Sequence, residues 1–137
     1  QVGQAALHGP ADVERVRDAL QHVAAENERV IAAAGALRAG DLALVGALLS
    51  SSHGSLRDQY EVSSAELDAA VACAMSHPAC IGARMTGAGF GGCAIALVAS
   101  GGAEEFAGAM REALPRIVPS SGDVFVVSAS GGAATTP

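Results

Sequence analysis

Large aromatic side chains are nearly absent from this chain. Its 137 residues include no Trp, one Tyr and three Phe. Stacking of nucleobases on aromatic rings is therefore not a main means of binding here, and the core has to be built from Ala, Val, Leu and Ile. Half of the residues are apolar, so a chain of this length can still bury the core of one domain.

Basic residues are also scarce. Eight Lys and Arg stand against 14 Asp and Glu, which gives a formal net charge of −6. This acidic balance argues against the broad positive surface by which proteins bind nucleic acid, so we expect no nucleic-acid partner. A phosphate ligand is still compatible with it, since backbone N–H groups can bind an anion locally in an acidic protein.

Long apolar runs and paired cysteines are missing as well. No stretch approaches the ~20 apolar residues that cross a bilayer, and no signal-peptide pattern opens the chain, so we expect no membrane partner. Cys73, Cys80 and Cys93 are odd in number and lack the spacing of metal ligands. They favour a reduced, cytoplasmic setting without a metal site. We expect Cys93 to be a small core residue.

The first half of the chain has the hydrophobic periodicity of helices. From Pro10 to about Arg38, apolar residues recur every three or four positions, as in an amphipathic helix, and Gly40 is placed to end it. This stripe consists of Val13, Val16, Leu20, Val23, Asn27, Val30, Ile31, Ala34 and Leu37. It predicts one long helix that packs through these side chains.

Two shorter helices are expected before residue 80. Asp41 can cap a helix that runs to Leu49, where the polar segment 50–55 interrupts the apolar pattern. Ser63 and Glu66 form a capping box for a third helix that ends near residue 77.

The second half predicts strands around one more helix. Apolar runs at 81–85 and 94–98 indicate two strands, followed by a helix at 103–114 and a last strand at 123–128. Residues 2–7 form a weak candidate edge strand. A hairpin in the middle makes the sheet largely antiparallel with helices on one face, which is the α+β class; a paired edge strand would give a ferredoxin-like sandwich with extra helices.

The segment between the two central strands carries the strongest functional signal. Four of the six residues from Gly87 to Gly92 are glycine, with Thr86 at the entrance. Such a loop exposes backbone N–H groups and lets a ligand or another backbone approach closely. Its spacing fits G-x-G-x-x-G, but a strand follows instead of a helix N-terminus, so we do not expect dinucleotide binding. A glycine-rich hairpin that only needs positive φ angles remains the alternative.

Residues 82–98 resemble the third signature motif of the GHMP small-molecule kinases, in its galactokinase form. The similarity continues upstream in the same order, at residues 26–30, 37–42 and 52–68. Ser52-His53 and the Asp-x-Tyr-Glu-Val-Ser sequence that follows point to galactokinases in particular. The resemblance covers roughly residues 13–128.

The resemblance implies a ferredoxin-like GHMP-kinase C-terminal domain at residues 1–130. The small and polar residues at 131–137 predict a flexible tail. It implies an enzyme that transfers the γ-phosphoryl group of ATP, as its Mg²⁺ complex, to the 1-hydroxyl of galactose or a related sugar. The glycine loop that it places at the active-site cleft comprises Thr86, Gly87, Ala88, Gly89, Phe90, Gly91 and Gly92. Ser52, His53 and Arg84 are candidate cleft-lining residues.

Other parts of the family pattern have no counterpart here. A phosphate loop of the second motif, a catalytic Asp and a nearby Arg are expected in an N-terminal domain that would bind most of the ATP and Mg²⁺. We therefore expect no catalytic residue in this chain, inactivity of the chain alone, and its own N-terminal domain as a partner. Gln1 in place of an initiator Met also suggests a fragment or processed product.

Two other functions stay open. Residues 18–21 and 24–25 depart from the galactokinase pattern, which leaves room for a non-catalytic sensor that binds sugar and nucleotide. The second alternative hypothesis is another sugar kinase of the superfamily, which acts on an amino sugar or a pentose. For single residues we expect structural roles: a solvated or structural His53, a structural Arg84 and a Phe90 that packs as a plug at the loop tip.

Overall fold

The computed structural model describes residues 9–135, which form helices and one antiparallel hairpin. In chain order the elements are α1 (Pro10–Ala39), α2 (Leu42–Asp58), α3 (Ala65–Met75), β1 (Cys80–Thr86), β2 (Cys93–Val98), the short 3-10 helix η1 (Ser100–Gly102) and α4 (Ala103–Ile117). The predicted α+β class with an antiparallel sheet is confirmed. The predicted edge strand at 2–7 lies outside the described residues.

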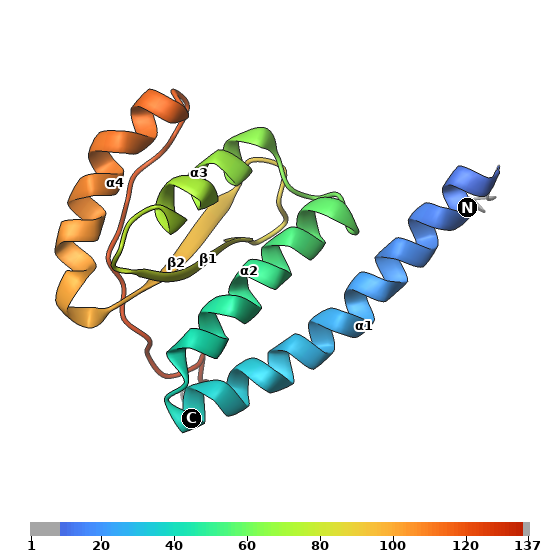
Figure 1. Ribbon diagram of the computed structural model, residues 1–137, viewed down its shortest axis with the longest axis horizontal. Helices are drawn as coiled ribbons and strands as arrows, with labels where there is room; N and C mark the ends of the chain where they lie inside the picture. The colour runs from blue at the N-terminus through green and yellow to red at the C-terminus, as the bar shows by residue number, and fades with distance from the viewer. Residues whose placement is uncertain (1–8, 136–137) are drawn as a thin grey trace.

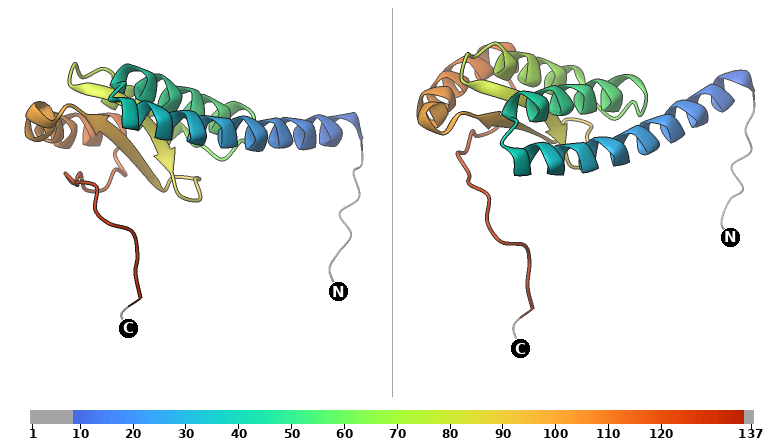
Figure 2. Two further views of the ribbon diagram at one scale, coloured as in Figure 1. Left: turned by 90° about the horizontal axis from the view of Figure 1, so that it is seen from below. Right: turned by 60° about the horizontal axis from the view of Figure 1, so that its bottom comes forward.

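The helices are layered on one face of the hairpin (Figures 1 and 2). α2 packs on β1, α3 packs on both strands, α4 packs against α3, and α1 packs against α2. β1 and β2 pair from Thr86 and Cys93 next to the connecting loop to Cys80 and Val98 at the other end. This arrangement places the glycine loop at one end of the hairpin. No helix within residues 9–135 is both long enough and apolar enough to span a bilayer.

Two apolar clusters hold these layers together. The larger lies between α3, β1 and α4 and contains Val71, Cys73, Ala74, Ala83, Phe106 and Met110. The smaller contains Leu56, Leu67 and Met85, with Val62 packed against it. Met85 is 1% exposed and sits at the base of the glycine loop, so this second cluster anchors the strand that leads into the loop.

β2 is covered less completely than β1. Cys93, Ala94 and Ile95 are exposed, so the prediction that Cys93 is a core residue is wrong. Helices cover one face of a hairpin of two strands, and the first half of β2, next to the loop, lies outside that cover. Cys73 on α3 is the buried cysteine.

Residues 123–128 form no strand, contrary to the prediction. Their position is set by α4: the Arg111 guanidinium donates a hydrogen bond to the Val124 carbonyl at 3.0 Å. Phe125 and Val127 are 76% and 84% exposed. A β-forming composition is not enough for a strand, which must also pair with a strand edge, and residues 123–128 pair with neither β1 nor β2.

Two helix boundaries also differ from the prediction. α2 continues without interruption to Asp58, because the polar side chains Ser52, His53 and Ser55 all find partners within the fold. α3 is capped by Ser64 instead of Ser63: the Ser64 hydroxyl accepts a hydrogen bond from the Leu67 N–H at 3.1 Å.

α1 packs through a face that the periodicity did not indicate. His22 and Ala36 are the buried residues of this helix, whereas most of the predicted apolar stripe is exposed. The exposed members are Val13, Val16, Leu20, Val23, Val30, Ile31 and Leu37, with values between 43% and 74%. α1 also extends past the rest of the fold at its N-terminal end (Figure 1). The long helix is therefore confirmed, and the burial of its stripe within this chain is wrong.

Candidate functional site

The glycine loop follows a left-handed backbone path that few residue types adopt. Gly87, Gly89 and Gly91 have φ angles of 77°, 85° and 97°. Phe90 has a φ of 57° between two of these glycines. Glycine enters this region at little cost, which explains why the segment is rich in it.

The loop tip is fixed to the connection between α2 and α3. The Phe90 N–H donates a hydrogen bond to the Val62 carbonyl at 2.8 Å, and the Gly92 N–H donates to the Gly89 carbonyl at 3.2 Å. A Cβ atom on Gly89 would lie 2.1 Å from the Val62 oxygen, so only glycine allows this approach. The loop is therefore a held conformation and not a free hairpin turn.

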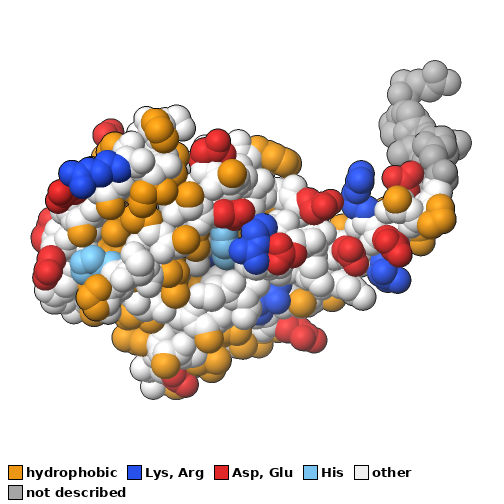
Figure 3. Space-filling view, turned by 45° about the horizontal axis from the view of Figure 1, so that its top comes forward, with side chains coloured by type: hydrophobic (Ala, Val, Ile, Leu, Met, Phe, Trp, Pro, Cys, Tyr) orange, Lys and Arg blue, Asp and Glu red, His pale blue; other side chains and the backbone are white. Residues whose placement is uncertain are grey.

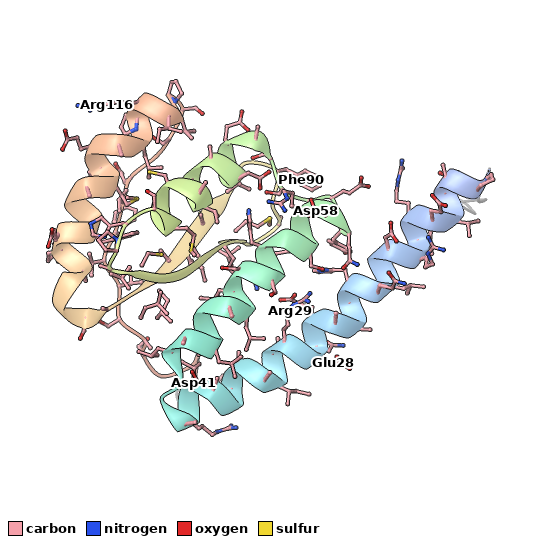
Figure 4. The ribbon with its side chains drawn as sticks, viewed as in Figure 1. Glu28, Arg29, Asp41, Asp58, Phe90 and Arg116 are labelled. Atoms are coloured by element: carbon pink, nitrogen blue, oxygen red, sulfur yellow. The ribbon has the colours of Figure 1, made fainter. Side chains whose placement is uncertain are left out.

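Phe90 does not plug the core of this chain. Its side chain is 74% exposed, and Figure 4 places it with Asp58 at the end of the molecule where α2 stops. The prediction of a packing plug is wrong for the described residues. The positive φ of Phe90 and the anchoring of its N–H turn the ring outward instead of onto the hairpin.

Most N–H groups of the loop stay available to a ligand. Within residues 9–135, the N–H groups of Gly87, Ala88, Gly89 and Gly91 have no hydrogen-bond acceptor, unlike those of Phe90 and Gly92. Successive N–H groups along such a left-handed path form a concave donor surface that suits an anion. The chemistry that this loop offers is positioning and charge stabilisation, without acid or base groups.

Arg84 joins three elements beneath the loop. Its NH1 group donates to the Ser52 hydroxyl at 2.9 Å and lies 3.2 Å from a Glu26 carboxylate oxygen, while its Nε donates to the Met85 carbonyl at 2.7 Å. The Ser52 hydroxyl in turn donates to Glu26 at 2.7 Å. Arg84 and Ser52 therefore clamp β1 to α2 and, through Glu26, to α1. These contacts agree with the expected structural role of Arg84.

Glu26 is the centre of this cluster and was not among the predicted site residues. Arg29 on the same helix also binds its carboxylate, at 2.9 Å through Nε. Figure 4 shows Arg29 pointing into the space between α1 and α2, whereas Glu28 points away from it. A charged residue on the packing face of a helix needs polar partners, so Glu26 could have been predicted as a site residue. The apolar stripe of α1, however, indicated the wrong packing face.

The partners of Glu26 keep its carboxylate charged. Burial alone would raise the pKa of this group, but hydrogen bonds from Ser52 and Arg29, with the charges of Arg29 and Arg84, outweigh that effect. The net result is a Glu26 pKa below its ordinary value. The cluster is thus an ionised clamp, held together by charge-assisted hydrogen bonds.

His53 lies on α2 and is 5% exposed. Its Nδ1 atom accepts a hydrogen bond from the Met85 N–H at 3.1 Å, and its Nε2 atom lies 2.9 Å from the Asp68 carboxylate. An accepting Nδ1 leaves the ring proton on Nε2, which donates to Asp68. This agrees with the expected structural role of His53. Asp68, on α3, is a second polar partner that the sequence did not single out.

His22 takes part in packing between α1 and the end of α2. Its Nδ1 atom lies 2.7 Å from the Ser55 hydroxyl, and its ring stacks on Tyr60 at 4.9 Å between centroids. Burial, together with the charges of Arg29 and Arg84, lowers the pKa of His22 against the opposing effect of Glu26. Within residues 9–135, no three His, Cys, Asp or Glu side chains come together in a group that could hold a metal ion.

Two hollows of the surface lie away from the glycine loop. One, of about 580 Å³, lies between α4 and residues 121–125; another, of about 220 Å³, is lined by residues of α2 and α3 that include His53 and Asp68. Neither contains a residue of the loop. Figure 3 shows one face of the molecule, on which opposite charges lie next to one another and hydrophobic side chains are scattered between them. Most of the loop is exposed, and it lines neither of these two hollows.

Comparison with known proteins places this arrangement in a family. The model of the family "GHMP kinases C terminal" matches residues 33–116. The chain is 44% identical to the galactokinase of Enterococcus faecalis over 130 residues, which cover 95% of this chain and 33% of that protein. It is 53% identical to the galactokinase of Chloroflexus aurantiacus over 90 residues, 66% of this chain and 23% of that protein. The chain thus spans a third or less of these relatives.

Solved structures agree with these sequence matches. The Lactococcus lactis galactokinase complexed with galactose superposes with a TM-score of 0.69 at 42% identity, over 82% of this chain and 28% of that chain. The L. major mevalonate kinase in complex with R-mevalonate gives a TM-score of 0.60 at 25% identity, over 77% and 36%. With a family model that matches more than half of its residues, the chain belongs to the GHMP kinases, as a C-terminal domain of the galactokinase type.

Proposed function

We propose that this chain is the C-terminal part of a galactokinase, an enzyme that transfers the γ-phosphoryl group of ATP to the 1-hydroxyl of galactose. The observation that carries the proposal is the glycine loop 87–92, a held left-handed path with four unpaired N–H groups. Galactokinases are the relatives at 40–53% identity, and one similar structure contains galactose. We therefore infer galactose, or a related sugar, as the substrate.

The loop suits phosphoryl transfer because that reaction depends on positioning and on stabilising charge. Backbone N–H groups aimed at an anion can do this without moving and without titrating. ATP and Mg²⁺ need further groups, and the described residues hold no cluster of metal ligands. We assign the binding of ATP and Mg²⁺ mainly to an N-terminal domain. Thr86 to Gly92 then form one wall of the cleft, with Ser52, His53 and Arg84 as its support.

The exposed stripe of α1 supports an intramolecular partner. Leu20 and Ile31, at 66% and 74% exposed, belong to a row of seven large apolar side chains at helical spacing. Figure 3 shows such side chains between acidic and basic ones on the projecting end of α1. A row of this size on one helix face marks an interaction surface. We assign it to the N-terminal domain of the same kinase, since the relatives are about three times as long.

A chimera tests the proposal directly. Residues 1–137 would replace the aligned third of the Enterococcus faecalis galactokinase, and ATP consumption would be followed with and without galactose. We expect galactose-dependent turnover from the chimera and none from the 137-residue chain alone. Turnover by the chain alone would show that the assignment of catalysis to an N-terminal domain is wrong.

The N-terminal domain that belongs to this chain separates the alternatives. An intact phosphate loop and catalytic Asp in that domain would favour the kinase, and their loss would favour the sensor. Turnover of this chain with its own N-terminal domain on an amino sugar or a pentose, but not on galactose, would favour another sugar kinase. The double substitution Leu20→Glu and Ile31→Glu should lower the turnover of the chimera, whereas Glu28→Gln on the same helix should leave it unchanged.

For the cellular location of this protein we propose the cytoplasm, which its three free cysteines support.

A further inference from the structure

The base and the tip of the glycine loop connect to one chain of hydrogen-bonded polar groups, in which His53 is buried and Ser63 and Asp68 are half-buried. At its base, the Met85 N–H donates to His53 Nδ1 at 3.1 Å. At its tip, the Phe90 N–H donates to the Val62 carbonyl at 2.8 Å. Met85 precedes the loop by two residues and lies on β1, whereas Val62 belongs to the connection between α2 and α3. Two separate segments therefore hold the same loop.

Asp68 links these two segments. Its Oδ1 atom accepts a hydrogen bond from His53 Nε2 at 2.9 Å and another from the Ser63 hydroxyl at 2.7 Å. Ser63 directly follows Val62, so the chain of contacts runs from Met85 through His53, Asp68 and Ser63 back to the loop tip. It closes a ring around residues 86–89.

The backbone inside this ring has little freedom. Gly89 faces the Val62 oxygen so closely that a Cβ atom there would also lie 3.1 Å from the Met85 side chain. The Val62 N–H is itself held by the Leu56 carbonyl at 3.1 Å. A shift of the connection between α2 and α3 therefore displaces the loop tip, and a shift of α2 displaces its base.

The roles of His53 and Ser63 go beyond filling space in the core. The apolar cluster of Leu56, Leu67 and Met85 already buries this region. A hydrophobic side chain at position 53 would fill the same space, but it would leave the Met85 N–H without a partner, which is costly for a buried donor. His53 also cannot act as an external base, because it is buried and both ring nitrogens are engaged.

We propose that His53, Asp68 and Ser63 are positioning residues, which hold the glycine loop in the conformation that stabilises the transferred phosphoryl group. The inference rests on the proposed kinase function for its last step, and on the geometry of this chain alone for the rest. None of the three touches the reacting atoms in this scheme; each acts through the backbone of the loop.

Adjacent serines provide a matched pair of variants. Ser63→Ala removes the link between Asp68 and the loop tip, whereas Ser64→Ala removes the cap of α3 and leaves the ring intact. Amide hydrogen exchange of the 137-residue chain, followed by NMR, measures the local effect. We expect Ser63→Ala to speed exchange of the Phe90 amide about fivefold or more relative to amides within β1, and Ser64→Ala to leave that ratio unchanged. Equal ratios in the two variants would overturn the proposal.

Two substitutions of His53 test its two hydrogen bonds separately, the one to the Met85 N–H and the one to Asp68. Asn places an oxygen near the position of Nδ1, and Gln places an amide nitrogen near that of Nε2. His53→Asn should therefore retain protection of the Met85 amide and lose that of Phe90, and His53→Gln should do the reverse. Loss of both in both variants would mean that His53 is only a packing residue. This pair decides the question even if Ser63→Ala does not fold.

Turnover is the separate functional arm. In the chimera with the Enterococcus faecalis galactokinase, we expect Ser63→Ala to lower kcat about tenfold with little change in KM for galactose, because the loop acts on the transition state. Ser64→Ala should leave both constants unchanged. An unchanged kcat in a chimera with a loosened loop would refute the positioning role. A parent chimera without any turnover would refute the proposed function, while the exchange data would still decide whether the ring holds the loop.

Discussion

Gly46 on α2 and Gly82 on β1 touch through their backbones. A Cβ atom on Gly82 would lie 2.7 Å from the Gly46 Cα, and one on Gly46 would lie 2.1 Å from the Ile81 carbonyl oxygen. Neither glycine has a positive φ, so close approach alone explains their presence. This contact brings α2 close enough to β1 for Ser52 and His53 to reach the base of the glycine loop.

Alanine at either position should therefore separate the two elements. We expect Gly46→Ala and Gly82→Ala each to lower the free energy of unfolding by about 2–3 kcal/mol, the usual cost of overpacking. Gly54→Ala on the same helix is the matched control, because the nearest atom to its Cβ would be the movable Arg57 end at 3.9 Å. That change should stabilise the chain by about 0.5–1 kcal/mol. Urea denaturation measures all three, and equal effects at positions 46 and 54 would contradict the close contact.

Neutralising Glu26 should weaken the clamp between α1, α2 and β1. We expect Glu26→Gln to cost about 1–2 kcal/mol at pH 7, because Arg29 and Arg84 then lack their carboxylate. Glu28→Gln, whose side chain points away from α2 in Figure 4, should stay within about 0.5 kcal/mol of the parent.

The pH dependence of the same variant has a defined sign. The folded pKa of Glu26 is lower than the ordinary value of 4.5, so its carboxylate stabilises the fold fully above that pH. This contribution is lost as the pH falls from 4.5 through the folded pKa. The stability difference between the parent and Glu26→Gln should therefore be constant near neutrality and shrink below pH 4.5. A difference that grows on acidification would contradict an ionised Glu26.

Glycines of the loop should differ in their tolerance of alanine. Gly91→Ala meets open space and suffers only from a φ of 97°, a cost of about 1 kcal/mol. Gly89→Ala adds contact with the Val62 oxygen to the same strain, so we expect a cost of about 2–3 kcal/mol. Urea denaturation of the two variants side by side makes the comparison. Similar costs would mean that the loop tip is not held against Val62.

The three cysteines should react with a thiol reagent in a fixed order. Cys93 is exposed and should be modified first, whereas Cys73 is buried and should react only on unfolding. Burial raises the pKa of Cys80, so its thiolate is disfavoured and its reaction slow. Stopped-flow labelling should show one fast thiol, which Cys93→Ser removes. Fast labelling that survives this substitution would contradict the exposure of the first half of β2.

Local signals located most of the elements. Gly40 adopts the left-handed φ of 71° expected of a helix end, and Asp41 caps α2 by accepting the Leu44 N–H. These features depend on a few neighbouring residues, which is why they can be predicted. The strand expected at 123–128 failed for the opposite reason, since pairing depends on a distant edge.

The polar cluster under the loop was predicted only in part. Ser52, His53 and Arg84 were named, but their partners are distant along the chain. Glu26 lies 26 residues from Ser52 and 58 from Arg84, and Asp68 lies 15 residues from His53. The apolar stripe of α1 suggested a packing face that excludes Glu26, because most of the hydrophobic residues lie on the other side of the helix. Periodicity indicates an apolar face; it does not say whether this chain or another surface covers it.

The sequence by itself determined the glycine-rich turn, the helices that precede it and the kinase family, because backbone freedom, helix capping and motif similarity are properties of short segments. The tertiary structure decided that Gly46 meets Gly82, that His53 and Asp68 connect the two ends of the loop, and that the apolar side of α1 stays exposed. These features depend on which surfaces come together once the helices pack on the hairpin. That choice is made by distant contacts, which no single stretch of the chain encodes.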